Sequence, residues 1–265
     1  MKAQVYSIDG TAKKQVDLPA VFEELVRPDI INRAASAVRS SKFQAKGPFV
    51  FAGMQTTAAY VGRRRAYRAN INTGTARLPR VKLPKGKSGE VRKVPQSRTG
   101  RAAHPPRVEH VLKETINDKE RRKAIRSALA ATALREFVEK RGHRVAKLKS
   151  LPLVIENDFE NITKTKEVLK ILAKLGLGEE MQRAQKITMR AGKGKARGRP
   201  YRVKKSVLIV ISKNAPIVKA ARNLTGFDIV SYKQLNADVL APGGVPGRLT
   251  LFSENALNET SKYFA

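Results

Sequence analysis

The sequence contains no cysteine and no tryptophan, and only three of its 265 residues are histidine. Without cysteine the chain has no disulfide, no cysteine-ligated zinc site and no thiol nucleophile. Acidic residues are also scarce, at 22 against 54 lysines and arginines. No stretch approaches the ~18 uninterrupted apolar residues that a transmembrane helix needs. These absences exclude thiol and disulfide chemistry and leave a formal net charge of +32.

Positive charge is therefore the dominant property of the composition. Such a charge opposes compaction by self-repulsion and requires a polyanionic partner, usually nucleic acid, with an anionic membrane as the weaker alternative. A hydrophobic content of 41% is enough for a core, in one large domain or two small ones. The first residues, 1–7, lack a long apolar signal core and predict a strand, so we expect a cytoplasmic protein.

One segment, residues 41–107, concentrates this charge. It contains sixteen lysines and arginines and a single acid, Glu90. It also contains seven glycines and six prolines, so neither a helix nor a central strand can run through most of it. Its apolar residues keep no lasting period, and such a segment buries too little apolar surface to offset its ordering entropy. We predict a long extended basic loop, inserted near the N-terminal third of a folded domain.

The rest of the chain alternates between strand and helix patterns. Strands are expected at residues 2–8, 151–155, 207–211, 227–232 and 248–252. Helices are expected at residues 28–41, 117–142, 168–175, 216–224 and 254–264, the second with a capping box between Asn117 and Glu120. The run at 207–211 is apolar on both faces, as in a central parallel strand. We predict one globular α/β domain, residues 1–40 and 108–265, with a mostly parallel sheet flanked by helices.

Motifs for catalysis or cofactors were sought, because parallel α/β sheets often bind nucleotides. Gly176-Leu177-Gly178 follows a helix and lacks the third glycine of a dinucleotide fingerprint. Gly86-Lys87-Ser88 resembles the end of a phosphate-binding loop, but no leading glycine or apolar strand precedes it. No set of residues specifies a catalytic site, so we expect neither an enzyme nor a cofactor, and no small-molecule substrate.

The histidines and acidic residues also do not predict a metal site. His104 and His110 flank two prolines and would form a poor metal site, so solvated or RNA-contacting histidines are the simpler interpretation. Glu156, Asp158 and Glu160 alternate across a loop and are compatible with a hard cation. An ordinary solvated acidic loop explains them more simply, and we predict no metal site.

The basic segments are the strongest functional signal. Four arginines surround Tyr67 in the run Arg63–Arg68, and guanidinium groups both bind phosphate and stack on unpaired bases. This combination suits irregular RNA better than duplex DNA. A merely solvated, disordered basic linker is the alternative, but linkers rarely carry aromatic rings. The first part of the segment carries five of them: Phe43, Phe49, Phe51, Tyr60 and Tyr67.

A second basic segment covers residues 189–202. No acid occurs between Glu180 and Asp228, whereas thirteen lysines and arginines do. We therefore predict RNA contacts from both segments and assign them by residue type. The predicted RNA-binding residues are Arg63, Arg64, Arg65, Tyr67, Arg68, Arg77, Arg80, Lys82, Lys85, Lys87, Arg92, Lys93, Arg98, Arg101, His104 and Arg107, followed by Arg190, Lys193, Lys195, Arg197, Arg199 and Arg202.

Three stretches carry a resemblance to a known family: residues 100–107 with the helix 120–132, residues 190–199, and residues 245–257. In order and spacing, the chain resembles the large-subunit ribosomal proteins of the L-four type, in their archaeal form. The resemblance implies a globular α/β domain on the ribosome and a loop that penetrates the ribosomal RNA. It also implies that the loop tip, residues 62–70, helps line the nascent-peptide exit tunnel. The tunnel-lining residues would be Arg63, Arg64, Arg65 and Arg68.

Three hypotheses follow. The first is a structural, ribosomal-RNA-binding protein of the large subunit, a ribonucleoprotein component in translation, with large-subunit RNA and neighbouring ribosomal proteins as partners. The second is an RNA-modifying enzyme that uses the basic loop as a substrate clamp. The third is a DNA-compacting chromatin protein, which would explain the charge but neither the aromatic residues nor the length of the loop.

Overall fold

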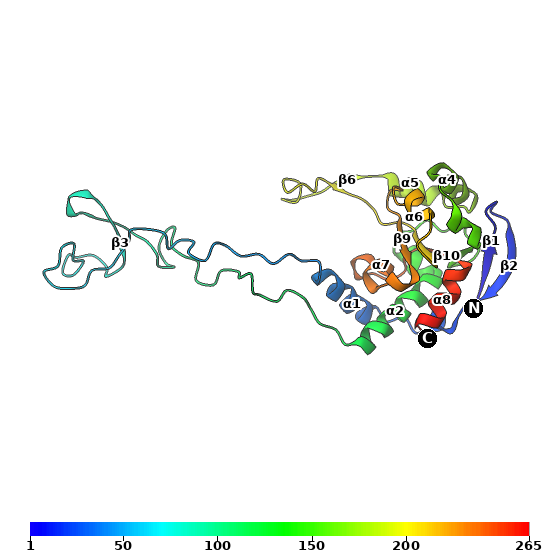
Figure 1. Ribbon diagram of the computed structural model, residues 1–265, viewed down its shortest axis with the longest axis horizontal. Helices are drawn as coiled ribbons and strands as arrows, with labels where there is room; N and C mark the ends of the chain where they lie inside the picture. The colour runs from blue at the N-terminus through cyan, green and yellow to red at the C-terminus, as the bar shows by residue number, and fades with distance from the viewer. Residues whose placement is uncertain (265) are drawn as a thin grey trace. The chain divides into compact units, whose positions relative to one another are not determined.

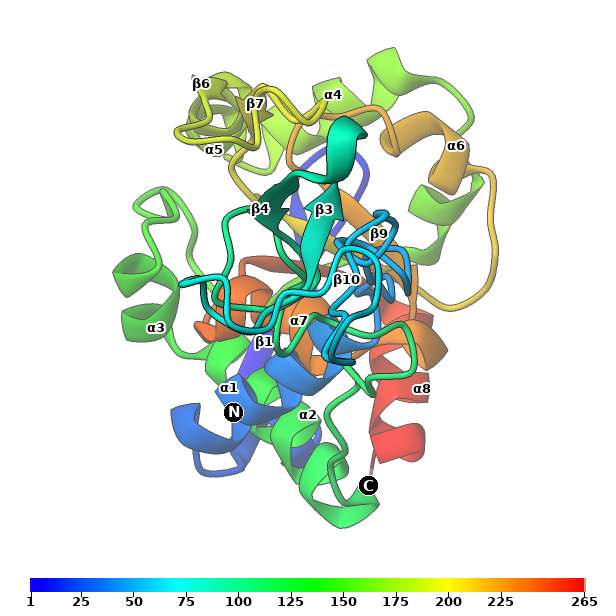
Figure 2. The same ribbon diagram turned by 90° about the vertical axis from the view of Figure 1, so that its left-hand side faces the viewer.

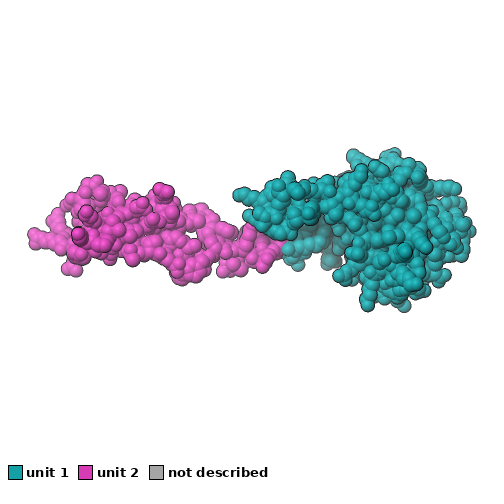
Figure 3. Space-filling model, turned by 90° about the horizontal axis from the view of Figure 1, so that it is seen from above, with its two compact units in different colours: residues 1–42, 113–265 teal, residues 43–112 magenta. Residues whose placement is uncertain are grey.

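A computed structural model describes residues 1–264. The chain divides into two compact units (Figure 3). Residues 1–42 and 113–265 form the first, here called the α/β unit. Residues 43–112 form the second, here called the loop unit. None of the helices in residues 1–264 has the length and apolar character needed to cross a bilayer.

A six-stranded sheet in the order β2-β1-β5-β10-β8-β9 forms the centre of the α/β unit (Figure 1). Only β1 and β2 pair antiparallel, and the other four pairings are parallel. The strands are β1 (Lys2–Tyr6), β2 (Ala12–Asp17), β5 (Leu153–Ile155), β8 (Leu208–Ile211), β9 (Asp228–Ser231) and β10 (Thr250–Ser253). The mostly parallel sheet is confirmed. Strand β2 was missed because its side chains are mostly exposed and give no alternating apolar pattern.

Helices cover both faces of this sheet. They are α1 (Pro28–Ser40), α2 (Asp118–Ala133), α3 (Arg135–Lys140), α4 (Thr165–Lys174), α5 (Gly178–Gln185), α6 (Ile217–Ala221), α7 (Ala237–Leu240) and α8 (Glu254–Phe264). In β8, Leu208 and Val210 pack with α1, α2, α7 and α8, whereas Ile209 and Ile211 pack with α4 and α6. Figure 2 shows α1, α2 and α8 gathered on one side and α4, α5 and α6 on the other. The apolar run predicted at 207–211 is thus buried on both faces.

The predicted helix 117–142 is wrong as a single element. It breaks at Leu134, which has an extended backbone between α2 and α3. Ile125 and Leu129 of α2 pack on one face of the sheet, whereas Val138 of α3 packs in the core on the opposite face. The break therefore carries the chain from one layer to the other. The predicted capping box is also wrong, because the side chain of Asn117 makes no capping hydrogen bond.

Two short hairpins were not predicted. In the loop unit, β3 (Arg80–Lys82) and β4 (Ser88–Val91) form an antiparallel pair, and Ala59 forms an isolated bridge to Arg80. In the α/β unit, β6 (Thr188–Met189) pairs antiparallel with β7 (Tyr201–Arg202), and the basic residues between them form the hairpin's end (Figure 1). Both hairpins lie in sequence that is basic and rich in glycine, where no apolar period marks a strand.

Candidate nucleic-acid interface

The outgoing and returning arms of the loop unit lie against each other at two glycines. A β-carbon at Gly53 would lie 2.8 Å from backbone atoms of Arg101, and Gly53 has a φ of +76°. A β-carbon at Gly47 would lie 3.0 Å from the carbonyl oxygen of Pro106. A β-carbon at Gly53 would force the Arg101 backbone to shift, and one at Gly47 would make a tight contact, so glycine at both positions favours the close approach of the two arms. These two glycines therefore serve the loop's own packing.

The tip of the loop unit is held by backbone contacts around Asn70. The Asn70 amide donates to the Val61 carbonyl at 2.9 Å, and the Ser88 hydroxyl donates to Asn70 Oδ1 at 3.2 Å. The Arg68 guanidinium donates to the Leu83 carbonyl at 2.9 Å and lies 5.1 Å from the centre of the Tyr67 ring. Arg68 therefore braces the tip internally.

Most of the predicted RNA-binding residues of the loop unit are exposed. The exposed ones are Arg63, Arg64, Arg65, Tyr67, Arg77, Lys82, Lys85, Lys87, Arg98, Arg101, His104 and Arg107. Arg68, Arg80, Arg92 and Lys93 are half-buried. Within residues 43–112 a single ion pair occurs, between Arg92 and Glu90 at 2.8 Å. The remaining cations have no acidic partner within residues 1–264, and most of them are exposed, which is the electrostatic state of an anion-binding surface.

The second basic segment is the end of the β6–β7 hairpin. Arg190 is half-buried, and its guanidinium donates to the carbonyls of Arg199 at 3.1 Å and Tyr201 at 3.3 Å. The other predicted residues here are exposed: Lys193, Lys195, Arg197, Arg199 and Arg202. Arg190 thus shapes the hairpin, and five cations surround it. The structure places these residues in the α/β unit, so the predicted residues form two separate groups along the chain.

The carboxyl ends of the parallel strands were the place where the enzyme hypothesis expected its site. Glu160 occupies this edge. Its carboxylate accepts hydrogen bonds from the Ser212 amide at 2.9 Å, from the Ser212 hydroxyl at 2.8 Å and from the Ser253 hydroxyl. Glu156 pairs with Lys13 at 2.6 Å instead of joining Glu160. In residues 1–264 no three acidic or histidine side chains gather as a metal site would require.

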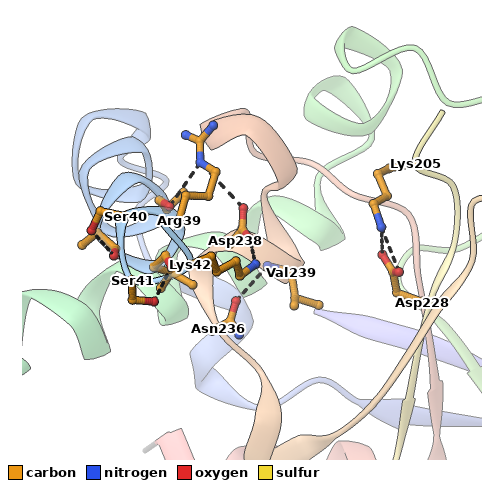
Figure 4. Close-up of polar contacts among 12 residues, drawn as sticks. Arg39, Ser40, Ser41, Lys42, Lys205, Asp228, Asn236, Asp238 and Val239 are labelled. Carbon is orange, nitrogen blue, oxygen red and sulfur yellow. Dashed lines mark hydrogen bonds and ion pairs between the residues drawn. The ribbon is translucent and has the colours of Figure 1, made fainter. Parts of the chain in front are cut away.

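Sequence reasoning missed Arg248, which is completely buried. Its guanidinium donates to the Ser206 carbonyl at 2.9 Å, to the Val239 carbonyl at 2.8 Å and to Asp228 Oδ2 at 2.6 Å. Lys205 pairs with the same Asp228 at 2.9 Å (Figure 4). A buried arginine cannot be told from an exposed one by composition, although Arg248 does lie within the motif 245–257. Its role is to fix the chain where the β6–β7 hairpin returns to the sheet.

A second buried network supports the other side of that hairpin. Glu180 accepts from His143 Nδ1 at 2.7 Å, from Arg183 and from the Ser206 hydroxyl at 2.9 Å. Burial by itself raises the pKa of Glu180, but hydrogen bonds from Arg183 and His143 outweigh it and lower the pKa to about 2. Burial lowers the pKa of His143 despite Glu180, so the ring is neutral near pH 7 and donates through Nδ1.

The last turn of α1 is fixed in a similar way at the start of the basic segment. Lys42 pairs with Asp238 of α7 at 2.7 Å, and the guanidinium of Arg39 lies 3.8 Å from the same carboxylate (Figure 4). Asn236 caps α7 by accepting from the Val239 amide at 2.9 Å. Both basic segments therefore leave the α/β unit from positions fixed by acidic residues.

Comparison with known proteins identifies the family of the chain. A model of the ribosomal protein L4/L1 family matches residues 16–263. The chain is 45% identical to the large ribosomal subunit protein uL4 of Methanocaldococcus jannaschii, over the whole of both chains. It is 45% identical to that of Pyrobaculum aerophilum over 99% of this chain and 90% of the relative, and 44% identical to that of Halorubrum lacusprofundi over 98% and 99%. The chain therefore belongs to the ribosomal protein L4/L1 family.

Proposed function

We propose that this protein is a structural constituent of the large ribosomal subunit that binds large-subunit ribosomal RNA and stabilises its fold during assembly. It acts in translation, in the cytoplasm as part of the ribosome, with ribosomal RNA and neighbouring ribosomal proteins as partners. Full-length similarity to archaeal large-subunit proteins supports this role. The family consists of ribosomal proteins, so the hypothesis of an RNA-modifying enzyme is set aside.

The observation that carries the proposal is the uncompensated charge of the loop unit. Its fifteen lysines and arginines face two acids, and one ion pair forms. Folding of the loop unit without a partner brings like charges together. Binding to RNA neutralises those charges and releases counterions. We infer that residues 41–107 act as one extended, RNA-penetrating insertion, and that residues 1–40 and 108–265 act as its globular α/β domain.

We propose further that residues 62–70 help line the nascent-peptide exit tunnel. Arg63, Arg64 and Arg65 are exposed and make no ion pair within residues 1–264, so their guanidinium groups are free for a ligand. Arg68 is already bound to Leu83 and stacked beside Tyr67. The first three are therefore the stronger candidates for contacts with RNA or the nascent chain, and Arg68 orients the tip.

The test is RNA crosslinking in reconstituted large subunits, with mapping of the attached nucleotides. Crosslinks from residues 43–107 should fall in large-subunit RNA, and those from residues 63–65 should fall at the tunnel wall. In solution, binding by ~8 phosphate contacts gives a log–log salt slope of about −5 to −7. A protein that prefers duplex DNA at equal salt, or that stays soluble and free of ribosomes, would contradict the proposal.

A deletion tests whether the loop tip anchors the protein in the RNA or only lines the tunnel. Removing residues 62–70 should leave RNA assembly largely intact, because most cations of both basic segments remain. Assembly is measured by sedimentation of subunits containing the variant. Failure of assembly from this deletion alone would make the tip an anchor. Without RNA, residues ~43–105 should be cut by protease before the α/β unit is cut.

A further inference from the structure

A cationic hollow lies at the foot of the β6–β7 hairpin, and Arg202 is the one residue of its lining that was predicted from the sequence. The hollow has a volume of about 530 Å³, and we call it the hairpin-foot groove. Its lining residues come from the α3 end, α5, the hairpin and the turn after α7. They are Arg141, Arg183, Thr188, Arg202, Val203, Lys204, Lys205, Pro242 and Gly243. Five of these nine are cationic and none is acidic, which marks the groove as a site for an anion.

Other hollows of the α/β unit differ in this respect. The hollow between α1 and α2 is lined by Asp29 and Glu120 as well as by cations. The hollow beside α7 is lined by Asp228 and Asp238. In those two places acidic side chains already neutralise the positive charge. The lining of the hairpin-foot groove contains no acid. Two of its cations, Arg183 and Lys205, pair with Glu180 and Asp228 outside the lining, and the other three have no acidic partner.

Two of its guanidinium groups are fixed before any ligand arrives. Arg141 donates to the carbonyls of Pro242, at 2.7 Å, and Val245. Arg183 donates to buried Glu180 and, at 3.0 Å, to the Lys205 carbonyl. Burial, together with the nearby charges of Arg248 and Arg183, lowers the pKa of Arg141 to about 10. Arg141 stays charged at neutral pH, and the crowding of like charges is relieved by an anion.

Two further cations remain free to close on that anion. Arg202 and Lys204 are exposed, and their side chains make no hydrogen bond or ion pair with any residue among 1–264. Lys205 is held by Asp228 (Figure 4). The groove thus combines fixed guanidinium groups, which lower the ordering cost of binding, with exposed cationic side chains that have no acidic partner.

We propose that the hairpin-foot groove binds the sugar–phosphate backbone of RNA, as a preformed site independent of the loop unit. No aromatic residue is among its lining residues, so it lacks a ring on which a base would stack, whereas guanidinium forks match phosphate oxygens. The inference rests on the proposed ribosomal role and extends it to Arg141, Arg183, Lys204 and Lys205, which sequence reasoning did not select. It gives the α/β unit a fixed phosphate contact beside the hairpin.

The test compares two double variants of the full chain. Arg202→Gln with Lys204→Gln removes the unpaired cations of the groove and leaves the buried networks intact. Lys166→Gln with Lys170→Gln removes the same charge from α4, where both lysines are exposed, unpaired and outside the groove. With large-subunit ribosomal RNA, the first variant should reduce the log–log salt slope by ~1.4, at ~0.7 per lost phosphate contact. The control should match wild type, and equal slopes for both variants would overturn the proposal.

A second measurement does not depend on ribosomal RNA. Hydrogen–deuterium exchange of the full chain is followed with and without tripolyphosphate. Wild type and the α4 control should gain protection in peptides covering residues 183–188, 202–206 and 241–245, and the groove variant should lose it. If tripolyphosphate still protects these peptides in the groove variant, the proposal that the groove binds an anion is wrong. If protection behaves as expected but wild type fails to bind large-subunit RNA, the ribosomal role fails and the anion site stands.

Discussion

The two units of this protein treat positive charge in opposite ways. In residues 1–264, all ion pairs but one join residues of the α/β unit. There, cations such as Arg248 and Arg183 are bound by buried or half-buried acids. In the loop unit, Arg92 has an acidic partner and the other cations do not. Paired charge in the α/β unit holds the fold together, whereas most charge in the loop unit, like that of the β6–β7 hairpin, has no acidic partner.

Backbone conformation separates the units in the same way. Every non-glycine residue with positive φ in residues 1–264 lies in the loop unit. These residues are Arg65, Arg68, Asn72, Lys85, Lys93 and Thr99. A left-handed conformation costs a side chain about 1–2 kcal/mol, while in the α/β unit glycine takes it without that cost. The backbone of the loop unit therefore carries strain that the backbone of the α/β unit avoids.

The largest expected effect comes from removing a buried cation of the α/β unit. Arg248→Met should lower the free energy of unfolding by about 3–5 kcal/mol, because Asp228 and two buried carbonyls lose their donor. Urea unfolding followed by far-UV circular dichroism measures it. Arg80→Met in the loop unit is the matched control, with an expected change within about 0.5 kcal/mol. Equal losses of unfolding free energy in the two variants would contradict the idea that cations stabilise the α/β unit and not the loop unit.

The next effect depends on pH. Because the pKa of Glu180 is lowered from 4.5 to about 2 in the folded state, its carboxylate stabilises the fold above pH 4.5. That contribution is lost as the pH falls through this range, and is on the order of 3 kcal/mol. Glu180→Gln should be less stable than wild type at neutral pH, and its stability should change less than that of wild type between pH 5 and pH 2. A variant with an unchanged acid profile would show that Glu180 is not charged in the fold.

The fold was predictable where pattern and period agree. The apolar run 207–211, Pro28 at the start of α1 and Gly176 after α4 identified a parallel sheet with helices. The break at Leu134 was not predictable, because it depends on which face of a three-layer fold each half of the helix packs against. Tertiary burial overrides local helix propensity there.

The candidate interface was predictable by residue type and not by role. Lysine and arginine mark the basic segments whether or not their side chains are exposed. Sequence alone did not show that Arg68 and Arg190 bind backbone carbonyls of their own segments. It also did not select Arg141 or Lys204, because the groove is assembled from elements distant in sequence. Which groups a side chain contacts depends on the folded structure, and residue type alone does not give that information.

A smaller and local effect is expected where the arms of the loop unit meet. Gly53→Ala places a β-carbon 2.8 Å from the Arg101 backbone, so the arms must separate. Gly74→Ala is the matched control, because Gly74 also has positive φ and a β-carbon there meets nothing within 4 Å. Hydrogen exchange at residues 49–54 and 98–102 should rise in the first variant and stay near wild type in the second. The urea midpoint of the α/β unit should change in neither.

The smallest effect is expected at the exposed ion pair that precedes the loop unit. Lys42→Gln removes one cation from Asp238, but Arg39 remains near that carboxylate, and Lys42 is 65% exposed. The free energy of unfolding should fall by about 0.5 kcal/mol or less, and salt should remove the difference. Asp238→Asn should have the larger effect, because two cations lose one partner. Urea unfolding at low and high salt checks both. A loss from Lys42→Gln as large as that from Arg248→Met would mean that exposed ion pairs stabilise the α/β unit as strongly as buried ones, and burial would then not explain which charges hold the fold.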